Sequence, residues 1–226
     1  MALWLFPESL RLTAYNCRIM ENLFVVRAAE PRDDAAVAKL VVEGFLDKFR
    51  PVFKNRMDQS AKIMERWVYL EHTLGGVSSL VIEGPGPEEL VASVGVRIES
   101  SQDDEALARG LWKALRRHLG FVRASWAAIL LSYPRYVATS SEAYVERLVV
   151  SGKHRNQGMA RALLDAAETL ARESGKETVG LHVSEGNVAA LRLYESYGYE
   201  EKSRQRSLLT CYFLGIRDWL YLQKEL

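Results

Sequence analysis

The sequence is poor in the residues that build disulfide frameworks and metal centres. It contains 2 cysteines, Cys17 and Cys211, and 4 histidines scattered along 226 residues. Two cysteines cannot form a disulfide framework, so we expect a reduced, cytoplasmic protein without a metal. The longest apolar run, Trp126 to Leu131, is far shorter than the about 20 residues that span a bilayer.

An excess of charge of one sign is also missing. Lys and Arg number 30 and Asp and Glu number 29, which leaves a net charge of +1. This balance argues against a broad electrostatic surface for nucleic acid or an anionic membrane, although it allows a local basic pocket. The patterns G-x-x-x-x-G-K-[ST] and G-x-G-x-x-G are absent, which argues against a P-loop kinase and a dinucleotide-dependent dehydrogenase.

The composition is that of a protein with a substantial core, with 48% hydrophobic and 26% charged residues. Helical and strand periodicities alternate along the chain without an internal repeat or a linker, which predicts one α/β or α+β domain around a single sheet. Pro51 predicts a break after the first helix. The expected strands are 24–27, 77–82, 90–98, 143–150, 178–183, 199–206 and 219–224, and the expected helices are 33–49, 60–70, 103–118, 121–131, 156–173 and 187–197.

Residues 1–19 lack the early basic residue and the cleavage site of a secretory signal. Met20 begins a second plausible start, followed by the strand at 24–27 and by two aspartates at a helix cap position. We therefore predict an N-terminal extension over 1–19 and a domain over 20–226. The extension is either a natural segment packed on the surface or the product of a misplaced start codon.

The segment from Glu146 to Leu164 predicts an anion-binding turn. A strand leads into a turn that opens a helix, whose first backbone N–H groups lack internal partners and lie at the positive end of the helix dipole. Gly158 allows a ligand to approach the backbone closely. Local positive charge comes from Lys153, His154, Arg155 and Arg161. The alternative is an ordinary helix start with a solvated basic first turn.

A second cluster runs from Asn187 to Tyr199. Asn187 and Tyr194 are seven residues apart, which places them on one face of a helix. Asn187 suits a helix start and can also donate to a ligand. Tyr194 is protonated at neutral pH, because a phenol has a pKa of about 10, and it can give a proton to a departing thiolate. The alternative for Tyr194 is a core aromatic residue whose hydroxyl is satisfied.

Together these clusters resemble the Gcn5-related N-acetyltransferase (GNAT) superfamily. Residues 155–160 match its [Q/R]-x-x-G-x-[G/A] pyrophosphate signature, and residues 187–199 are similar to its N-x-x-A-x-x-L-Y-x-x-x-G-[F/Y] segment. The resemblance covers residues 22–226. Gly152 stands where many members have Pro, and Ala160 replaces the final Gly of the signature. The stretch 100–142 is longer and more helical than the usual link, and we interpret it as a helical insertion.

The resemblance implies the GNAT acyl-CoA N-acyltransferase fold, a mixed and mostly antiparallel sheet with splayed strands, flanked by helices. It also implies acetyl-CoA as co-substrate, bound where two strands splay apart. The backbone of Leu148, Val149 and Val150 would pair with the pantetheine arm, and a bulge in that strand would turn an N–H toward the thioester carbonyl. Asn187 would contact the pantetheine or phosphate region, and Tyr194 would act as general acid. The pyrophosphate signature residues are Arg155, Asn156, Gln157, Gly158, Met159, Ala160 and Arg161, with the amides from Asn156 onward holding the phosphates.

The acceptor is expected to be an amine, which must lose a proton before it attacks. Glu146 is the candidate general base, because strand alternation places it on the same face as Leu148. The alternatives are a water chain, or a Glu146 that only pairs with Arg147 or another neighbour. Weaker candidates for the base are Glu43, Asp47 and His182.

The resemblance implies an acceptor site along 45–53, Tyr144 and 207–217. Aromatic residues in these stretches form either core or an apolar acceptor wall: Phe45, Phe49, Phe53, Tyr212 and Phe213. The insertion is either a lid or a dimer surface, and one of its faces carries Leu107, Leu111, Leu115 and Leu119.

The leading hypothesis is an acetyl-CoA-dependent N-acetyltransferase that acts on a primary amine of a small molecule or a peptide. One alternative keeps the fold but uses another acyl group or acceptor. Another is a CoA-binding regulatory module with little turnover. We expect no nucleic acid or membrane partner and leave a homodimer open.

Overall fold

The computed structural model describes residues 15–19, 22–74, 76–86, 89–98, 104–136 and 139–226. Strands and helices alternate much as the hydrophobic patterns predict. The strands are β1 (Tyr15–Ile19), β2 (Asn22–Ala28), β3 (Val77–Glu83), β4 (Leu90–Arg97), β5 (Glu142–Val150), β6 (Thr178–Ser184), β7 (Glu200–Arg206) and β8 (Asp218–Glu225). The helices are α1 (Asp34–Gly44), α2 (Leu46–Phe53), α3 (Met57–Leu74), α4 (Asp104–Leu119), α5 (Phe121–Leu131), α6 (Met159–Glu173), α7 (Val188–Ser196) and α8 (Leu208–Leu214).

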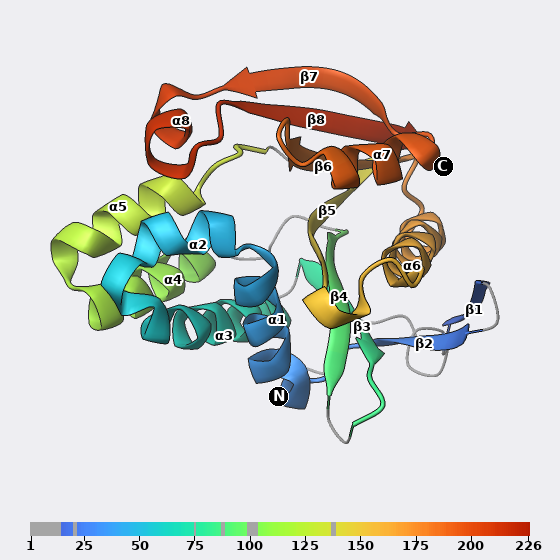
Figure 1. The fold of residues 1–226 in the computed structure, drawn as a ribbon, viewed down its shortest axis with the longest axis horizontal. Coiled ribbons are helices and arrows are strands. Elements are labelled where there is room, and N and C mark those ends of the chain that lie inside the picture. Colours follow the sequence, from blue (N-terminus) through green and yellow to red (C-terminus); the bar gives the residue numbers. More distant parts are fainter. Residues whose placement is uncertain (1–14, 20–21, 75, 87–88, 99–103, 137–138) are drawn as a thin grey trace.

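These strands form one sheet in the order β1-β2-β3-β4-β5-β6-β8-β7 (Figure 1). Neighbouring strands run antiparallel, except β5 and β6, which are parallel. A mixed, mostly antiparallel sheet flanked by helices confirms the expected fold class.

Strand β5 lies in the middle of the sheet and has two irregularities. Toward β4 the register shifts at Gly95 and Val96, so Glu146 has no partner and forms a β-bulge. Toward β6 the pairing covers only Glu142 to Val145, although β5 continues to Val150. Within the described part of the chain, the β6-facing edge of β5 is therefore open beyond Val145. The splay and the bulge expected in this strand are both present.

Helices cover both faces of the sheet and build two separate cores. Successive residues of β3 alternate between them, because a strand points its side chains to opposite faces. Leu80 and Ile82 join the core formed with α6 and α7, and Val81 joins the core formed with α1 to α5. None of the helices in the described ranges is long and apolar enough to cross a bilayer.

The insertion expected over 100–142 forms α4 and α5, while residues 100–103 and 137–138 lie outside the described residues. Helix α4 packs against α3 through its leucine face. Leu115 is fully buried there, and Leu111 and Leu119 pack against the same core. Leu111, Leu115 and Leu119 on this face are therefore part of the domain core, while a lid or a dimer surface formed by the insertion stays a prediction.

The first predicted helix breaks earlier than expected. Helix α1 ends at Gly44, a bend at Phe45 follows, and α2 contains Pro51 in its interior. A Cβ at Gly44 would collide with Val149 of β5, so the close packing of α1 on the sheet requires glycine at this position. Glycine weakens a helix, whereas Pro51 removes one hydrogen bond from α2 without ending it.

Strand β1 pairs antiparallel with β2, although its residues fall within the expected extension. This strand was not among those expected from the sequence. Residues 1–14 and the boundary at 20 lie outside the described residues. The division into an extension over 1–19 and a domain over 20–226 stays a prediction.

Candidate active site

The turn between β5 and α6 has the backbone shape of an anion site. A 3₁₀ turn, Gly152–His154, leads into the loop before the helix. Asn156 and Gly158 have positive φ angles of 62° and 85°. Helix α6 begins only at Met159, three residues later than predicted, because left-handed residues cannot belong to a right-handed helix. Left-handed residues in a turn of this kind are typical of backbone anion sites.

The N-terminus of α6 has no capping side chain. Gly158 is the N-cap residue, no side chain among the described residues is seen to accept a hydrogen bond from the first turn, and the first turn contains no acidic residue. The amides of Met159, Ala160 and Arg161 therefore lack a partner within their own helix. Arg161 is exposed, as are Lys153, Arg155, Asn156 and Gln157 before it. The geometry and the charge fit a phosphate group.

The strand residues before this turn point alternately to the two cores. Val149 belongs to the core under α1, and Leu148 and Val150 pack against the core under α6. Their side chains thus leave the open backbone edge of β5 uncovered. This edge is the feature that an extended, amide-containing arm can pair with.

Helix α7 holds the two residues predicted from the second motif. Asn187 is its N-cap and accepts a hydrogen bond from Ala190 N at 3.2 Å, which confirms the expected helix start. Tyr194 is 7% exposed in the core shared with α6. Burial raises the pKa of Tyr194 to about 12, so its hydroxyl is protonated at physiological pH.

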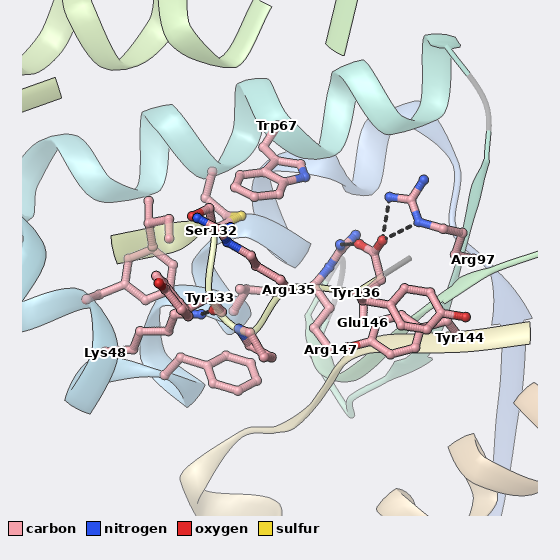
Figure 2. Close-up of a pocket in the computed structure, with 16 residues that line it drawn as sticks. Lys48, Trp67, Arg97, Ser132, Tyr133, Arg135, Tyr136, Tyr144, Glu146 and Arg147 are labelled. Carbon is pink, nitrogen blue, oxygen red and sulfur yellow. Dashed lines mark hydrogen bonds and ion pairs between the residues drawn. The ribbon is translucent and has the colours of Figure 1, made fainter. Parts of the chain in front are cut away.

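The other face of β5 borders a cavity of about 740 Å³. Its walls come from α1, α2, α3, β4, β5 and the segment 131–136 at and after the end of α5 (Figure 2). Phe45, Phe49 and Trp67 form apolar walls, and Tyr136 stacks on Tyr144 with ring centroids 3.8 Å apart. Phe45 and Phe49 line this cavity, and Phe49 is at the same time a core residue with 3% exposure, so their role as an acceptor wall stays a prediction.

Phe53 belongs instead to the core, with 2% exposure. On α8, Tyr212 is 84% exposed. None of the residues 207–217 lines the cavity within the described part of the chain. Neither Glu43 nor Asp47, both exposed, lines it.

One end of the cavity holds a network of ion pairs. Arg97 Nε donates to Glu146 Oε1 at 2.7 Å. Behind it, Arg147 pairs with Glu71 of α3 through two hydrogen bonds of 2.6 and 3.1 Å. Glu71 is 1% exposed, and burial raises its pKa to about 7 against the opposing effect of Arg147. A Cβ at Gly95 would lie 3.0 Å from Arg147 Cζ, so glycine there gives the guanidinium its space.

The bulge changes the face on which Glu146 lies. Alternation predicts the same face as Leu148, but Glu146 lines the cavity and Leu148 packs under α6. That reason for selecting Glu146 was wrong, because the extra residue of a bulge resets the alternation. The pairing expected as the alternative is present, with Arg147 Nη1 donating to Glu146 Oε2 at 3.5 Å. Glu146 nevertheless lies at the cavity.

His182 lies in a hydrogen-bonded chain beside the cavity. Arg135 N donates to Gln205 Oε1 at 3.2 Å, and Gln205 Nε2 donates to Arg135 O at 2.7 Å, which fixes the orientation of the amide. Gln205 Nε2 is thus the donor toward His182 Nε2, 3.2 Å away. Burial lowers the pKa of His182 to about 4, so the ring is neutral. Its proton is therefore on Nδ1 and is donated to the Tyr144 hydroxyl at 2.8 Å.

This tautomer leaves the Tyr144 O–H hydrogen for another acceptor. It also makes His182 a poor general base, because both ring nitrogens are engaged. His182 was a weaker candidate for the base, and its contacts with Tyr144 and Gln205 favour a structural role instead.

Several cavity residues were not singled out from the sequence, although one of them, Lys48, lies within the stretch 45–53 that was expected at the acceptor site. They come from separate elements, and no short motif connects them. The only local signal was a lysine between two phenylalanines at helical spacing. These residues are Lys48, Trp67, Arg97, Arg135 and Tyr136.

A family model described as the Acetyltransferase (GNAT) family matches residues 80–199, which is more than half of the chain. The protein therefore belongs to the GNAT family of acetyltransferases. The matched span contains the bulge in β5, the turn before α6 and helix α7.

A curated relative, GCN5-related N-acetyltransferase 4, chloroplastic, of Arabidopsis thaliana, is 37% identical over 57 residues, or 25% of this chain. The match spans 20% of that protein's length. Two solved structures share the fold. The ribosomal-protein-alanine N-acetyltransferase of Brucella melitensis has a TM-score of 0.58 at 15% identity, covering 89% of this chain and 99% of that one. The PaiA N-acetyltransferase of Thermoplasma acidophilum, solved in complex with coenzyme A, has a TM-score of 0.57 at 10% identity, covering 90% and 99%.

Proposed function

We propose that this protein transfers the acetyl group of acetyl-CoA to a primary amine of a small molecule or a peptide, by direct attack of the amine on the thioester. The observation that carries the proposal is the uncapped N-terminus of α6 directly after the open edge of β5. Two cysteines in the whole sequence support a reducing compartment such as the cytoplasm.

The residues on the α6 side fit the cofactor. The amides of residues 156–161 would hold the pyrophosphate, with Arg155 at the start of the turn. The open edge of Leu148, Val149 and Val150 would pair with the pantetheine arm, and Asn187 would donate its side-chain amide near it. Acetyl-CoA would supply the activated acyl carbon. A backbone N–H at the bulge would donate to the carbonyl oxygen of the thioester.

Two side chains on opposite faces of the sheet would move the protons. On the cavity side, Glu146 or a water held by it would take a proton from the attacking amine nitrogen. On the α7 side, the Tyr194 hydroxyl would give a proton to the sulfur as the carbon–sulfur bond breaks. The raised pKa of Tyr194 keeps its hydroxyl protonated until that step, while it also makes the phenol a weaker acid than a free tyrosine.

Thermal unfolding with acetyl-CoA tests the cofactor, with ATP and NAD as controls. A ligand at about 100 times its Kd adds roughly 2.7 kcal/mol to the free energy of unfolding. For a chain of this size the midpoint should rise by roughly 5–10 °C. A rise with acetyl-CoA alone supports the proposal, and no rise at saturation contradicts it.

Release of the CoA thiol over a panel of amines separates the alternatives. An acetyltransferase releases thiol only when an amine is present. A binding module shows the thermal shift without thiol release. An acyltransferase of another kind releases thiol with a longer acyl-CoA or with a hydroxyl acceptor.

A further inference from the structure

The cationic residues of the cavity fall into two groups. Arg97 and Arg147 have carboxylate partners in Glu146 and Glu71. Lys48 and Arg135 also line the cavity. Among the residues that the structure describes, neither of these two has a carboxylate within ion-pair distance. The cavity thus contains positive charge that the described part of the protein does not balance.

Lys48 is the informative member of the second group, because its side chain is half-buried and its ammonium group is largely desolvated. Its Nζ donates to the backbone oxygen of Tyr133 at 2.8 Å and lies 5.4 Å from the centroid of a Trp219 ring. Burial lowers the pKa of Lys48 to about 8, and the charge of the exposed Asp47 opposes this only in part. A buried cation without a counter-charge costs free energy, which an anionic group bound beside it would offset.

The donors of Lys48 suit a carboxylate. An ammonium group has three N–H donors, and one of them is used by the Tyr133 oxygen. The remaining two can donate to the oxygens of a carboxylate bound beside the ammonium group. Arg135, whose guanidinium carbon lies 5.5 Å from the Tyr133 ring centroid, adds a second, exposed cation to the same cavity.

The positions of the charged groups give the cavity a direction. Lys48 lies at one end, and Glu146 with Arg97 lies toward the other (Figure 2). Phe49, Trp67 and Tyr136 form aromatic walls of the same cavity. An acceptor molecule with its amine at the Glu146 end and an anionic group at the Lys48 end would have an apolar part between these two groups.

We propose that the acceptor is an amine that also carries a carboxylate, and that Lys48 binds this carboxylate. The inference rests on the proposed acetyl transfer and names the substrate class for it. An amine with a phosphate, or one without an anionic group, would be a different acceptor. A comparison of acceptors with and without each acid group distinguishes both from the proposed class.

The kinetic test uses matched acceptors that differ only at the acid group. 4-(Aminomethyl)benzoate is compared with 4-(aminomethyl)benzamide, and 6-aminohexanoate with hexylamine and 5-aminopentyl phosphate. A charge-assisted bond of this kind should favour the carboxylate about tenfold to hundredfold in kcat/KM in at least one pair. Lys48→Met should reduce that ratio to near one, whereas Lys39→Met, at an exposed lysine of α1, should keep it.

A second measurement needs no turnover. Trace labelling of lysines with acetic anhydride is read by mass spectrometry in the presence of 3-phenylpropanoate, hexanoate or benzoate, with the corresponding amides as controls. A bound carboxylate keeps Lys48 protonated, so its labelling should slow several-fold with at least one acid and with none of the amides. Lys39 should label at an unchanged rate.

The outcomes separate the two proposals. Equal labelling of Lys48 with all three acids and their amides overturns the inference, as does a carboxylate preference that survives in Lys48→Met. A stronger preference for the phosphate also overturns it. A lack of acetyl-CoA binding refutes the proposed function, but the protection of Lys48 can still be measured.

Discussion

His182 Nδ1 lies 2.8 Å from the hydroxyl oxygen of Tyr144, at the point where β6 separates from β5. Pairing of the two strands ends at Val145 and Leu181, directly beside this contact. The hydrogen bond therefore joins the two strands at the fork, with Tyr144 on the cavity side and Gln205 of β7 on the other side of the ring. A change in the charge of His182 would therefore change the electrostatic potential at the cavity beside Tyr144.

The pH dependence of stability should report on this residue. The folded protein holds the pKa of His182 at about 4, while an unfolded histidine titrates near about 6.5. Between about pH 4 and 6.5 the unfolded chain therefore binds more protons at this residue than the folded protein does. Because of this difference, the contribution of His182 to the free energy of unfolding rises with pH across that range and stays constant above it. Denaturation of His182→Gln should show a flatter rise from pH 4 to 6.5 than the wild type. Equal slopes would show that the histidine titrates normally in the fold.

Replacing Gly158 should abolish acetyl-CoA binding. Its φ of 85° is left-handed, so Gly158→Ala should cost about 1–2 kcal/mol of stability and distort the turn. Gly175, at the other end of α6, has a φ of 70° and open space around it, which makes Gly175→Ala a matched control. Both variants should lose similar stability in urea, but only Gly158→Ala should lose affinity in calorimetry. An undiminished affinity in folded Gly158→Ala would refute the phosphate turn.

Tyr194→Phe should lower turnover while leaving acetyl-CoA affinity unchanged. A general acid contributes about 10²- to 10⁴-fold in rate, and the phenyl ring keeps the packing in the core. Tyr199, whose ring centroid is 5.8 Å from that of Tyr194, supplies the control Tyr199→Phe in the same core. Thiol release by the control should stay close to that of the wild type. Unchanged turnover in Tyr194→Phe would remove the general acid from the mechanism.

The buried pair of Arg147 and Glu71 should be costly to break from one side. Arg147→Met leaves the Glu71 carboxylate in the core without its partner, which should cost about 3–5 kcal/mol in the free energy of unfolding. The double variant Glu71→Leu with Arg147→Met should recover most of this loss, because an apolar pair replaces two buried charges. Urea denaturation of both single variants and the double variant measures the coupling. Additive losses would show that the pair contributes no interaction of its own.

The sequence predicted the features that depend on neighbouring residues. Gly158 and Asn187 lie at helix starts, as their local motifs indicate, and the apolar stripes of α4 and α6 face the cores. These features follow from backbone preferences and from periodicity within one element. The roles assigned to Tyr194, Glu146 and the turn residues stay predictions.

The features that the sequence did not predict depend on pairing between distant segments. Arg97 and Glu146 are 49 residues apart, and Arg147 and Glu71 are 76 apart. Their contacts follow from strand register and from the position of α3, which no local pattern specifies. The bulge is the clearest case, because a register shift opposite Gly95 decides the face on which Glu146 lies.

The open edge of β5 also has a consequence for aggregation and for amide hydrogen exchange. Unpaired strand edges usually invite foreign strands and lead to aggregation. This edge lies inside the sheet, where β6 is next in the strand order and still paired at Glu142 to Val145. A strand of another protein could pair with β5 only after β5 and β6 had separated. A narrow extended ligand, in contrast, can reach the unpaired part of β5 from the end where the two strands are already apart. The amides at this edge should therefore exchange with deuterium in the free protein without making it prone to aggregate.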